Sequence, residues 1–368
     1  MRVVIAPDSF KGSMPAAGAA ASLAAGWRAA RPADEVLTVP LADGGEGTLD
    51  VLAAALPGTR WHPARVTGPG GQPVDSRWLE LPGGTAVVEL AAASGLPLLR
   101  EPDPLGAHTT GLGEVIGHAL DAGARQVTIA LGGSASTDGG TGALAALGAR
   151  FLDAAGHPLP PGGGALRGLA AVDLAGLRPR PAGGVSCLSD VRAPLLGPAG
   201  AAAVFGPQKG ASPAQVALLD AGLAQLARLL GGDPDAPGAG AAGGTGYGLA
   251  TGWGALLTPG APRLCQMAGL DQALAGAGLV ITGEGRYDQT SGTGKVAGTV
   301  FAAAQAAGVP AALVAGQIAQ RPPPAVPFVI SLAELAGGAP QALADPDRYL
   351  RLAGQRLAAA AGRDAAAG

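Results

Sequence analysis

Short β-branched segments alternate with Ala- and Leu-rich segments of helical length along this chain. The first pair is Val3–Ala6 and a helix at Ala16–Ala30, and the second is Glu35–Val39 and a helix that ends near Leu56. The same rhythm returns at Leu279–Thr282 and continues to residue 331. Such alternation is typical of βαβ units around a mostly parallel sheet. The sequence therefore predicts an α/β fold.

The middle of the chain has a different pattern. Between Arg60 and Ala91, segments with a period of two are separated by Gly- and Pro-rich turns, which favours an antiparallel meander. Mixed helices and strands follow, including a long helix at about 212–230, and the Gly/Ala-rich stretch Asp233–Gly248 resembles a linker. We therefore predict a discontinuous first domain and an inserted mixed α/β domain, with these limits: 1–68 plus 281–368, and 69–280.

Charge and composition limit the partners. The formal net charge is −3 over 368 residues and no basic block occurs, so neither nucleic acid nor an anionic membrane is expected. The first apolar run, Val3–Ala6, is too short for a signal segment or a membrane span, which favours a cytoplasmic location. Cys187 and Cys265 have no metal-ligand spacing and are expected to be reduced and buried. Small molecules are the expected partners.

Lysine is rare in this chain. Lys and Arg together number 24, yet only Lys11, Lys209 and Lys295 are lysines, and each lies in a polar, glycine-flanked stretch. A compact ammonium group can approach phosphate or carboxylate as a point charge, where a planar guanidinium fits less well. Drift from Lys to Arg with three chance survivors is the alternative. We expect such loop lysines to bind anions and to contribute little packing.

Acidic and hydroxyl side chains stand among glycines, mostly after predicted strands. The carboxyl ends of parallel strands meet at one edge, so these side chains should converge on one crevice. Glycine-rich loops form anion-binding nests, and carboxylates beside phosphates suit Mg²⁺. Together with the lysines they indicate phosphoryl transfer, although each carboxylate alone could be a cap or turn residue. The stretches contain Asp8 and Ser9; Asp43, Gly44, Gly45 and Glu46; Ser134, Ser136 and Asp138; Asp190; and Glu284 and Asp288.

Generic nucleotide-binding motifs do not identify the chain. The segment that ends at Lys295 does not match the P-loop pattern Gly-x4-Gly-Lys-Ser/Thr, because Gln289 stands at the first glycine and Val296 at the Ser/Thr position. Residues 238–243 match a dinucleotide-binding pattern but follow no predicted strand. The match carries little weight for that reason.

Eight segments rich in glycine and polar residues occur in order along the chain: Ala6–Ser13, Pro40–Thr48, Thr110–Glu114, Gly132–Gly140, Ser189–Val191, Val204–Gly210, Gly238–Gly244 and Ile281–Asp288. Taken together, they closely resemble the bacterial two-domain type of the glycerate kinase family, and the resemblance covers the chain from Met1 to about its last helix. Ala193 stands where that family usually has Asn, and Gln289 lies one position earlier than usual.

The resemblance implies ATP-dependent phosphorylation of D-glycerate to phosphoglycerate. It also implies a Rossmann-like domain interrupted by an inserted domain, with the active site in the interdomain cleft and ATP as the phosphate donor; Mg²⁺ is expected from the carboxylates described above. Which hydroxyl is phosphorylated stays open, as does the oligomeric state, for which a homodimer is one option. A kinase for another small hydroxy acid, a non-catalytic cytosolic metabolite-binding protein and a metal-dependent phosphatase are the alternatives.

Charge logic assigns roles to the candidate residues. Lys11, Lys209 and Lys295 are expected to hold the glycerate carboxylate and the transferred phosphate, with Arg286 as an additional clamp. We favour Asp190 as general base, and Asp43 and Glu46 as metal ligands. The remaining candidates are expected to bind substrate or phosphate: Asp8, Ser9, Gly44, Gly45, Ser134, Ser136, Asp138, Glu284 and Asp288.

Overall fold

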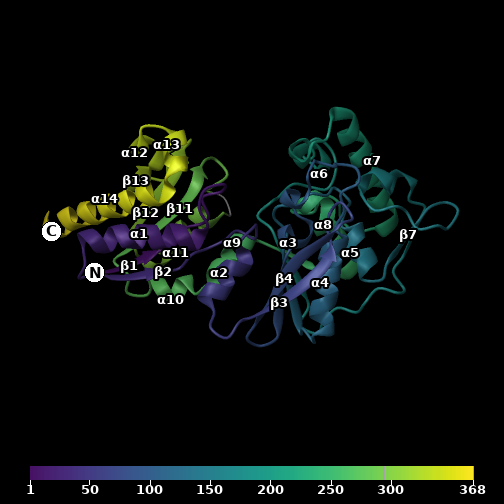
Figure 1. Cartoon of the computed structure of the whole chain (residues 1–368), viewed down its shortest axis with the longest axis horizontal. Helices are drawn as coiled ribbons and strands as arrows, with labels where there is room; N and C mark the ends of the chain where they lie inside the picture. The colour runs from purple at the N-terminus through teal and green to yellow at the C-terminus, as the bar shows by residue number, and fades with distance from the viewer. Residues whose placement is uncertain (293–294, 368) are drawn as a thin grey trace. The chain divides into compact units, whose positions relative to one another are not determined.

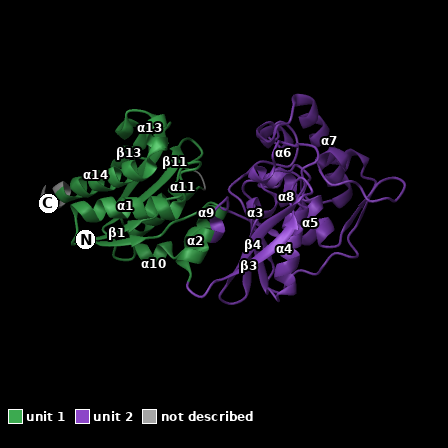
Figure 2. Cartoon of the chain, in the orientation of Figure 1, with its two compact units in different colours: residues 1–43, 50–56, 260–368 green, residues 44–49, 57–259 purple. Residues whose placement is uncertain are grey.

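The computed structural model of the chain describes residues 1–292 and 295–367 and contains two compact units (Figure 2). The first comprises Met1–Asp43, Asp50–Leu56 and Gly260–Gly368, and the second comprises Gly44–Leu49 and Pro57–Pro259. The sequence places the boundaries near residues 68 and 280, whereas the contacts change at residues 57 and 260. The first shift has a clear cause, because the strand over residues 60–67 pairs within the sheet of the second unit.

The first unit contains a five-stranded sheet in which every paired strand is parallel. Its order is β13-β12-β11-β1-β2, which corresponds to the 2-1-3-4-5 order of doubly wound folds when its strands are counted by themselves. The α/β expectation is thus confirmed (Figure 1). Its strands are β1 (Arg2–Ile5), β2 (Glu35–Thr38), β11 (Leu279–Tyr287), β12 (Ala311–Ile318) and β13 (Phe328–Ser331).

Helices cover both faces of this sheet, because successive buried residues of each central strand point to opposite sides. Val3 and Ile5 pack in the core formed with α1 and α14, while Val4 packs in the core formed with α9, α10 and α11. The helices of the unit are α1 (Ala16–Ala30), α9 (Gly260–Met267), α10 (Leu270–Leu274), α11 (Val296–Ala307), α12 (Leu332–Ala336), α13 (Ala339–Ala344) and α14 (Pro346–Ala367); α2 (Thr48–Ala55) spans the unit boundary.

The second unit has a six-stranded mixed sheet in the order β10-β9-β6-β5-β4-β3. The first three of its strands in the sequence form the expected antiparallel meander, and the others are parallel. A separate antiparallel pair, β7 and β8, lies outside this sheet. The strands are β3 (Arg60–Thr67), β4 (Pro73–Leu81), β5 (Thr85–Glu89), β6 (Gln126–Ala130), β7 (Arg150–Leu152), β8 (Ala171–Asp173), β9 (Val185–Leu188) and β10 (Leu256–Thr258).

The helices of the second unit bury one continuous apolar core against the sheet. The longest begins with a capping box, in which Ser212 accepts a hydrogen bond from the Gln215 N–H and Gln215 accepts one in return. The helices are α3 (Ala91–Ser94), α4 (Thr110–Asp121), α5 (Thr141–Ala146), α6 (Ala201–Phe205), α7 (Pro213–Leu230) and α8 (Ala241–Trp253), with 3-10 turns η1 (Leu96–Leu98), η2 (Gly163–Gly168) and η3 (Pro207–Lys209).

The linker interpretation of Asp233–Gly248 is wrong. The second half of that stretch enters helix α8, and its glycines are buried. A Cβ at Gly243 would collide with the carbonyl oxygen of Ser136, and one at Gly248 with that of Gly139. The glycines are therefore required for close backbone packing and do not indicate a flexible connection.

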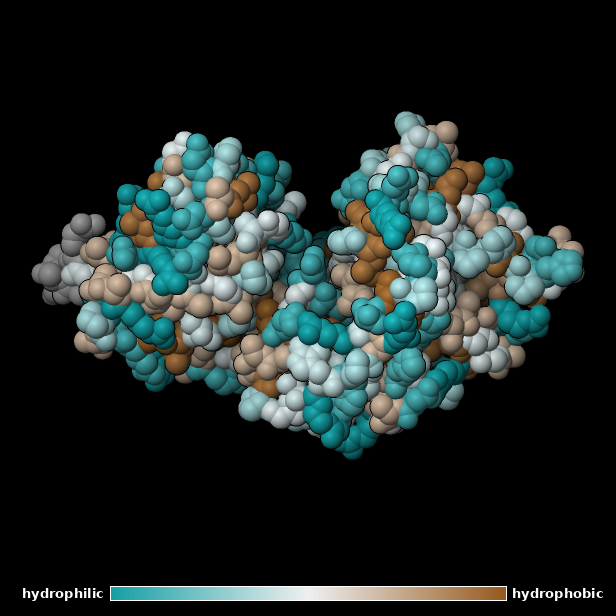
Figure 3. All heavy atoms as spheres, in the orientation of Figure 1, coloured by the Kyte–Doolittle hydropathy of each residue, from teal (hydrophilic) through white to brown (hydrophobic). Residues whose placement is uncertain are grey.

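The surface is of mixed character, and the cysteines are buried. Hydrophobic residues are scattered among hydrophilic ones on the face drawn in Figure 3. No helix in the described part of the chain combines the length and the apolar character needed to cross a membrane. Cys187 and Cys265 are free and buried, as expected.

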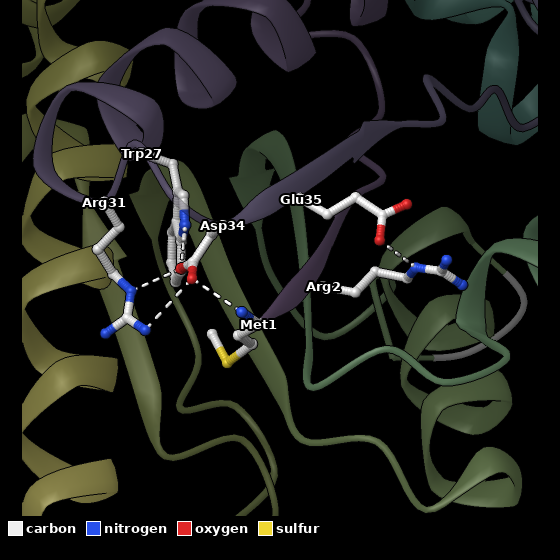
Figure 4. Close-up of polar contacts among 6 residues, drawn as sticks. All are labelled: Met1, Arg2, Trp27, Arg31, Asp34 and Glu35. Carbon is white, nitrogen blue, oxygen red and sulfur yellow. Dashed lines mark hydrogen bonds and ion pairs between the residues drawn. The ribbon is translucent and has the colours of Figure 1, made fainter.

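A polar cluster ties the start of β1 to the end of α1 (Figure 4). The Asp34 carboxylate accepts hydrogen bonds from the Met1 amine at 2.9 Å, the indole N–H of Trp27 at 3.1 Å and the Nε of Arg31 at 2.5 Å. The hydrogen bond from Arg31 is the main cause that lowers the pKa of Asp34 to about 2. Only 6% of its side chain is exposed.

We predict that Asp34→Ala lowers the free energy of unfolding by about 2 kcal/mol, the scale of hydrogen bonds to a charged group. The depressed pKa adds a pH dependence: this contribution is present above the unfolded-state pKa and is lost as pH falls from about 4 towards 2. Urea unfolding at pH 7 and pH 3 measures both effects. Glu35→Ala, which removes only the exposed pair with Arg2, is the matched control. A loss as large in the control would contradict the assignment.

Candidate active site

A cavity of about 330 Å³ lies in the first unit, at the carboxyl ends of β1, β11 and β12. Two segments far apart in the sequence, the loop after β1 and the end of β11 with its following turn, line the same space. This is the position at which ligands bind in doubly wound folds, where the strand order reverses. Eight of the predicted site residues line it: Asp8, Ser9, Lys11, Asp43, Glu284, Arg286, Asp288 and Lys295.

Backbone pairing fixes the two segments beside one another. The Asp8 N–H donates to the carbonyl of Gly283 at 2.8 Å, and the Thr282 hydroxyl donates to the carbonyl of Ala6 at 2.9 Å. Strand β11 is longer than the sequence predicts and runs on to Tyr287, so Glu284 belongs to a strand and not to a loop. Its extension is held by β12, with which it pairs as far as Tyr287.

Three carboxylates of the cavity lining, Asp8, Asp43 and Glu284, lie close enough to influence one another. Burial raises the pKa of Asp8 to about 7, and the neighbouring charge of Asp43 contributes to the increase, while Lys11 opposes the shift. Burial also raises the pKa of Glu284, a residue that is 8% exposed. Its Oε1 atom is buried and has no hydrogen-bond partner among the described residues. The site therefore holds negative charge that its own cations do not fully balance.

Asp288 has a local role as well. Its carboxylate accepts hydrogen bonds from the N–H and the hydroxyl of Thr290, at 2.9 and 2.7 Å. Both hydrogen bonds lower the pKa of Asp288, and the one from the Thr290 hydroxyl has the larger effect. Asp288 therefore acts as a turn residue, which was the alternative to a purely ligand-binding role. Lys295 follows as the N-cap of α11, and the two residues before it, Thr293 and Gly294, lie outside the described residues.

Two carboxylates of the cavity fit a hydrated divalent cation. No group of three or more His, Cys, Asp or Glu side chains in residues 1–292 and 295–367 is arranged to enclose a metal ion. Mg²⁺ however needs only one or two protein carboxylates when substrate phosphates complete its shell. Asp8 and Asp43 meet this requirement. Glu46, which the sequence predicted as a metal ligand together with Asp43, is exposed, belongs to the second unit and does not line the cavity.

Lys209 lies in the second unit, where it is buried. It ends the turn η3, is 3% exposed, and its ammonium donates to the carbonyl of Ser136 and lies 3.5 Å from the hydroxyl of Ser134. Burial lowers its pKa to about 8, and the charge of Asp138 opposes the shift. The expectation that this lysine contributes little packing is wrong, because nearly its whole side chain is enclosed.

Asp138 is fully buried, and its carboxylate is used by the chain itself. Oδ2 accepts from the N–H and hydroxyl of Thr109, at 2.9 and 2.7 Å, and from the N–H of Gly142 at 3.2 Å. Oδ1 accepts from the N–H of Gly140 at 3.1 Å. The carboxylate thereby joins the first turns of α4 and α5. It positions the loop over residues 132–140 and does not present its charge to solvent.

The remaining predicted residues of the second unit lie in or beside this loop and after β9. Ser136 is fully buried. Gly44 accepts a hydrogen bond from the N–H of Gly132, and a Cβ at Gly132 would collide with Gly45. Asp190 is half-buried and lies just after β9, as expected from its place after an apolar run.

Sequence reasoning missed two features. Glu89, at the end of β5, is buried and accepts from the N–H groups of Gly47 and Leu49, so it orders the loop that carries Glu46. The second feature is an apolar wall of the cavity, contributed by α12, α13 and the start of α14. Gln317, near the end of β12, also lines the cavity. The position of Gln317, two residues after the apolar run Ala311–Ala315, was a usable signal.

Comparison with known proteins identifies the family. The family model described as "Glycerate kinase family" matches residues 3–361. The chain belongs to the glycerate kinase family. A protein named glycerate 2-kinase from Escherichia coli (strain K12) is 44% identical over 305 residues, which cover 80% of each chain. A glycerate kinase from Bacillus subtilis (strain 168) is 44% identical over 331 residues, or 87% of this chain and 86% of that one.

A solved structure agrees with this assignment. The crystal structure of a candidate glycerate kinase 2 from Salmonella typhimurium LT2 superposes with a TM-score of 0.83 and is 38% identical. The match covers 99% of each chain. The glycerate kinase fold therefore extends over both compact units of this chain.

Proposed function

We propose that this member of the glycerate kinase family transfers the γ-phosphoryl group of ATP to a hydroxyl of D-glycerate, giving phosphoglycerate and ADP. The observation that carries the proposal is the cavity of the first unit, where Lys11, Lys295 and Arg286 line the same space as half-buried and buried carboxylates at the reversal point of the sheet. Phosphoryl transfer needs mainly positioning and charge neutralisation, and this set of side chains supplies both.

The cations have distinct tasks in this proposal. Lys11 and Lys295 present point charges to phosphate oxygens, and Arg286, whose side chain is 64% exposed, clamps an outer oxygen. Lys209 and the loop that it supports are proposed to hold the substrate carboxylate or the transferred phosphate. We propose Asp190 as the general base that accepts the proton of the attacking hydroxyl.

We also propose that catalysis depends on Mg²⁺. Asp8 and Asp43 would hold the ion, and their mutual repulsion, which contributes to the raised pKa of Asp8, would be offset by a divalent charge. When bound, the ion would neutralise charge on the triphosphate. The buried Oε1 of Glu284, which lacks a partner among the described residues, would then accept a hydrogen bond from a water molecule of its shell.

A coupled assay for ADP release tests the function. We expect ADP release that requires both ATP and D-glycerate, with phosphorus NMR of the product distinguishing the 2-phosphate from the 3-phosphate. Activity on another hydroxy acid alone would favour the broader kinase alternative. Release of inorganic phosphate without a phosphorylated product would indicate a phosphatase, and binding without turnover a metabolite-binding protein.

A variant links the activity to the cavity. Lys11→Met is expected to lower kcat/KM by about 10²-fold, the scale for removing one preorganised charge. Arg263→Met, which removes an exposed cation from α9 in the same unit but outside the cavity, is the matched control and should keep full activity. Equal activity of both variants would contradict the role of the cavity.

A further inference from the structure

The cavity of the first unit has a second side that the proposed chemistry leaves unused. The lining has a charged part and an apolar part. The charged residues described above form the first, and apolar side chains from α12, α13 and the start of α14 form the second. Leu343, on α13, is 58% exposed although it is large and apolar. The apolar part consists of Leu332, Ala339, Ala342, Leu343 and Pro346.

Glycerate does not explain this apolar wall. Each of its three carbon atoms carries oxygen, so it has no apolar face to bury. A nucleoside triphosphate has both required parts, a flat base that gains from contact with aliphatic side chains and a chain of phosphates that gains from lysines. We propose that this cavity is the ATP subsite, with the adenine against the wall of α12 and α13 and the triphosphate towards Lys11 and Lys295. This proposal rests on the proposed kinase function.

Position in the fold supports the assignment. The cavity opens where β1 and β11 separate the two halves of the sheet, which is where doubly wound folds of this strand order bind nucleotides and related cofactors. Gln317, near the end of β12, lines the same space, and its amide carries one acceptor and two donors. Such a group is complementary to the edge of adenine, which presents both a donor and an acceptor.

The number of cations in the lining supports it as well. The lining contains three cations, Lys11, Arg286 and Lys295, in a chain that has only three lysines in all. A single glycerate carboxylate would use one of them, whereas a triphosphate offers several anionic oxygens. The lining also contains four carboxylates, Asp8, Asp43, Glu284 and Asp288, whose negative charge would be offset by the Mg²⁺ ion proposed above.

Calorimetric titration of the full chain tests this directly, with three probes: ADP, inorganic tripolyphosphate and D-glycerate. Leu343→Asp should weaken ADP binding by roughly 10-fold, the scale for a lost apolar contact in a pocket, because it places a charge against the base. Binding of tripolyphosphate should change much less, since it has no base. Leu256→Asp, at an exposed leucine of β10 outside the cavity, is the matched control and should leave all three titrations unchanged.

The outcomes separate this inference from the kinase function. If Leu343→Asp keeps its folding midpoint and ADP affinity but loses D-glycerate, the wall belongs to the other substrate and the inference is overturned. Failure of the wild-type protein to bind ADP would overturn the inference too. If ADP binding depends on Leu343 but no phosphoglycerate forms, the nucleotide site stands and the proposed activity fails. An unchanged KM for ATP in an active Leu343→Asp enzyme would reject the site while leaving the kinase intact.

Discussion

Lys209→Met is expected to lower kcat/KM by about 10²–10³-fold without lowering stability. The first effect follows from the loss of a preorganised ammonium beside the loop over residues 132–140. The second follows from burial: Met fills nearly the same volume, and removing a charge that is 3% exposed also removes its desolvation cost. Lys209→Ala should behave differently, because the cavity it leaves costs about 2–3 kcal/mol.

The lowered pKa of Lys209 gives a second test of its role, through the pH dependence of activity and of stability. Its pKa is lowered to about 8, so the wild-type activity should fall as pH rises through 8 and the ammonium loses its proton. Stability should move in the opposite direction. Between pH 8 and the ordinary value of 10.5, the unfolded state binds more protons at this site than the folded state, so the free energy of unfolding rises with pH.

Comparison of the wild type with Lys209→Met separates the titration of the Lys209 ammonium from that of the other ionisable groups. Steady-state kinetics and urea unfolding from about pH 7 to about pH 10, the range that spans the shift, would give both curves. The difference in unfolding free energy should shift in favour of the wild type as pH increases. A wild-type kcat/KM that stays constant up to about pH 9.5 would contradict a role for the charged form. So would a Lys209→Met enzyme with unchanged turnover.

Much of the fold was predictable because local signals and tertiary packing agree. The helix at Ala16–Ala30 has the predicted limits, and strand β2 ends one residue before the predicted Val39. In both, Pro or charged residues mark the ends of an apolar segment. The antiparallel meander of the second unit was predictable for the same reason.

Other features could not be predicted from local sequence. Strand β11 continues through Gly285 and Arg286 because β12 offers it a partner, and no property of those residues announces that pairing. The Gly/Ala-rich segment up to Gly248 has the composition of a linker, yet its glycines allow backbone contact with Gly139 and Ser136. Composition reports which residues are small and does not report what they touch.

The candidate site divides in the same way. The strand-end rule brought Asp8 and Glu284 to one cavity, because it follows from the topology of a parallel sheet. Burial was not predictable from a polar motif, so the enclosure of Lys209 and Asp138 emerged only from the packing of α4, α5 and α8 around their loop. The apolar wall was missed because Leu332 and Leu343 belong to short helices that look like ordinary core elements.

The largest stability effect is expected at Asp138. Asp138→Ala would leave the buried N–H groups of Thr109, Gly140 and Gly142 without their acceptor, and each such donor costs about 1–3 kcal/mol. It would also remove a negative charge from the first turns of α4 and α5, where helix dipoles favour one. We expect a loss of about 3–5 kcal/mol, which corresponds to a Tm lower by roughly 10 °C.

Asp138→Asn distinguishes loss of charge from loss of shape. The amide can keep one oxygen towards Thr109 and Gly142, but its NH₂ group must then face the N–H of Gly140, so an intermediate loss is expected. Asp153→Ala is the matched control, because Asp153 also accepts two backbone N–H groups but lies at the surface, where water replaces it. Calorimetric scans should give Asp138→Ala the lowest melting temperature, Asp138→Asn an intermediate one and the control the highest. If Asp138→Ala unfolded no earlier than Asp153→Ala, the carboxylate would not be what holds the two helices together, and its charge would be free to serve the substrate.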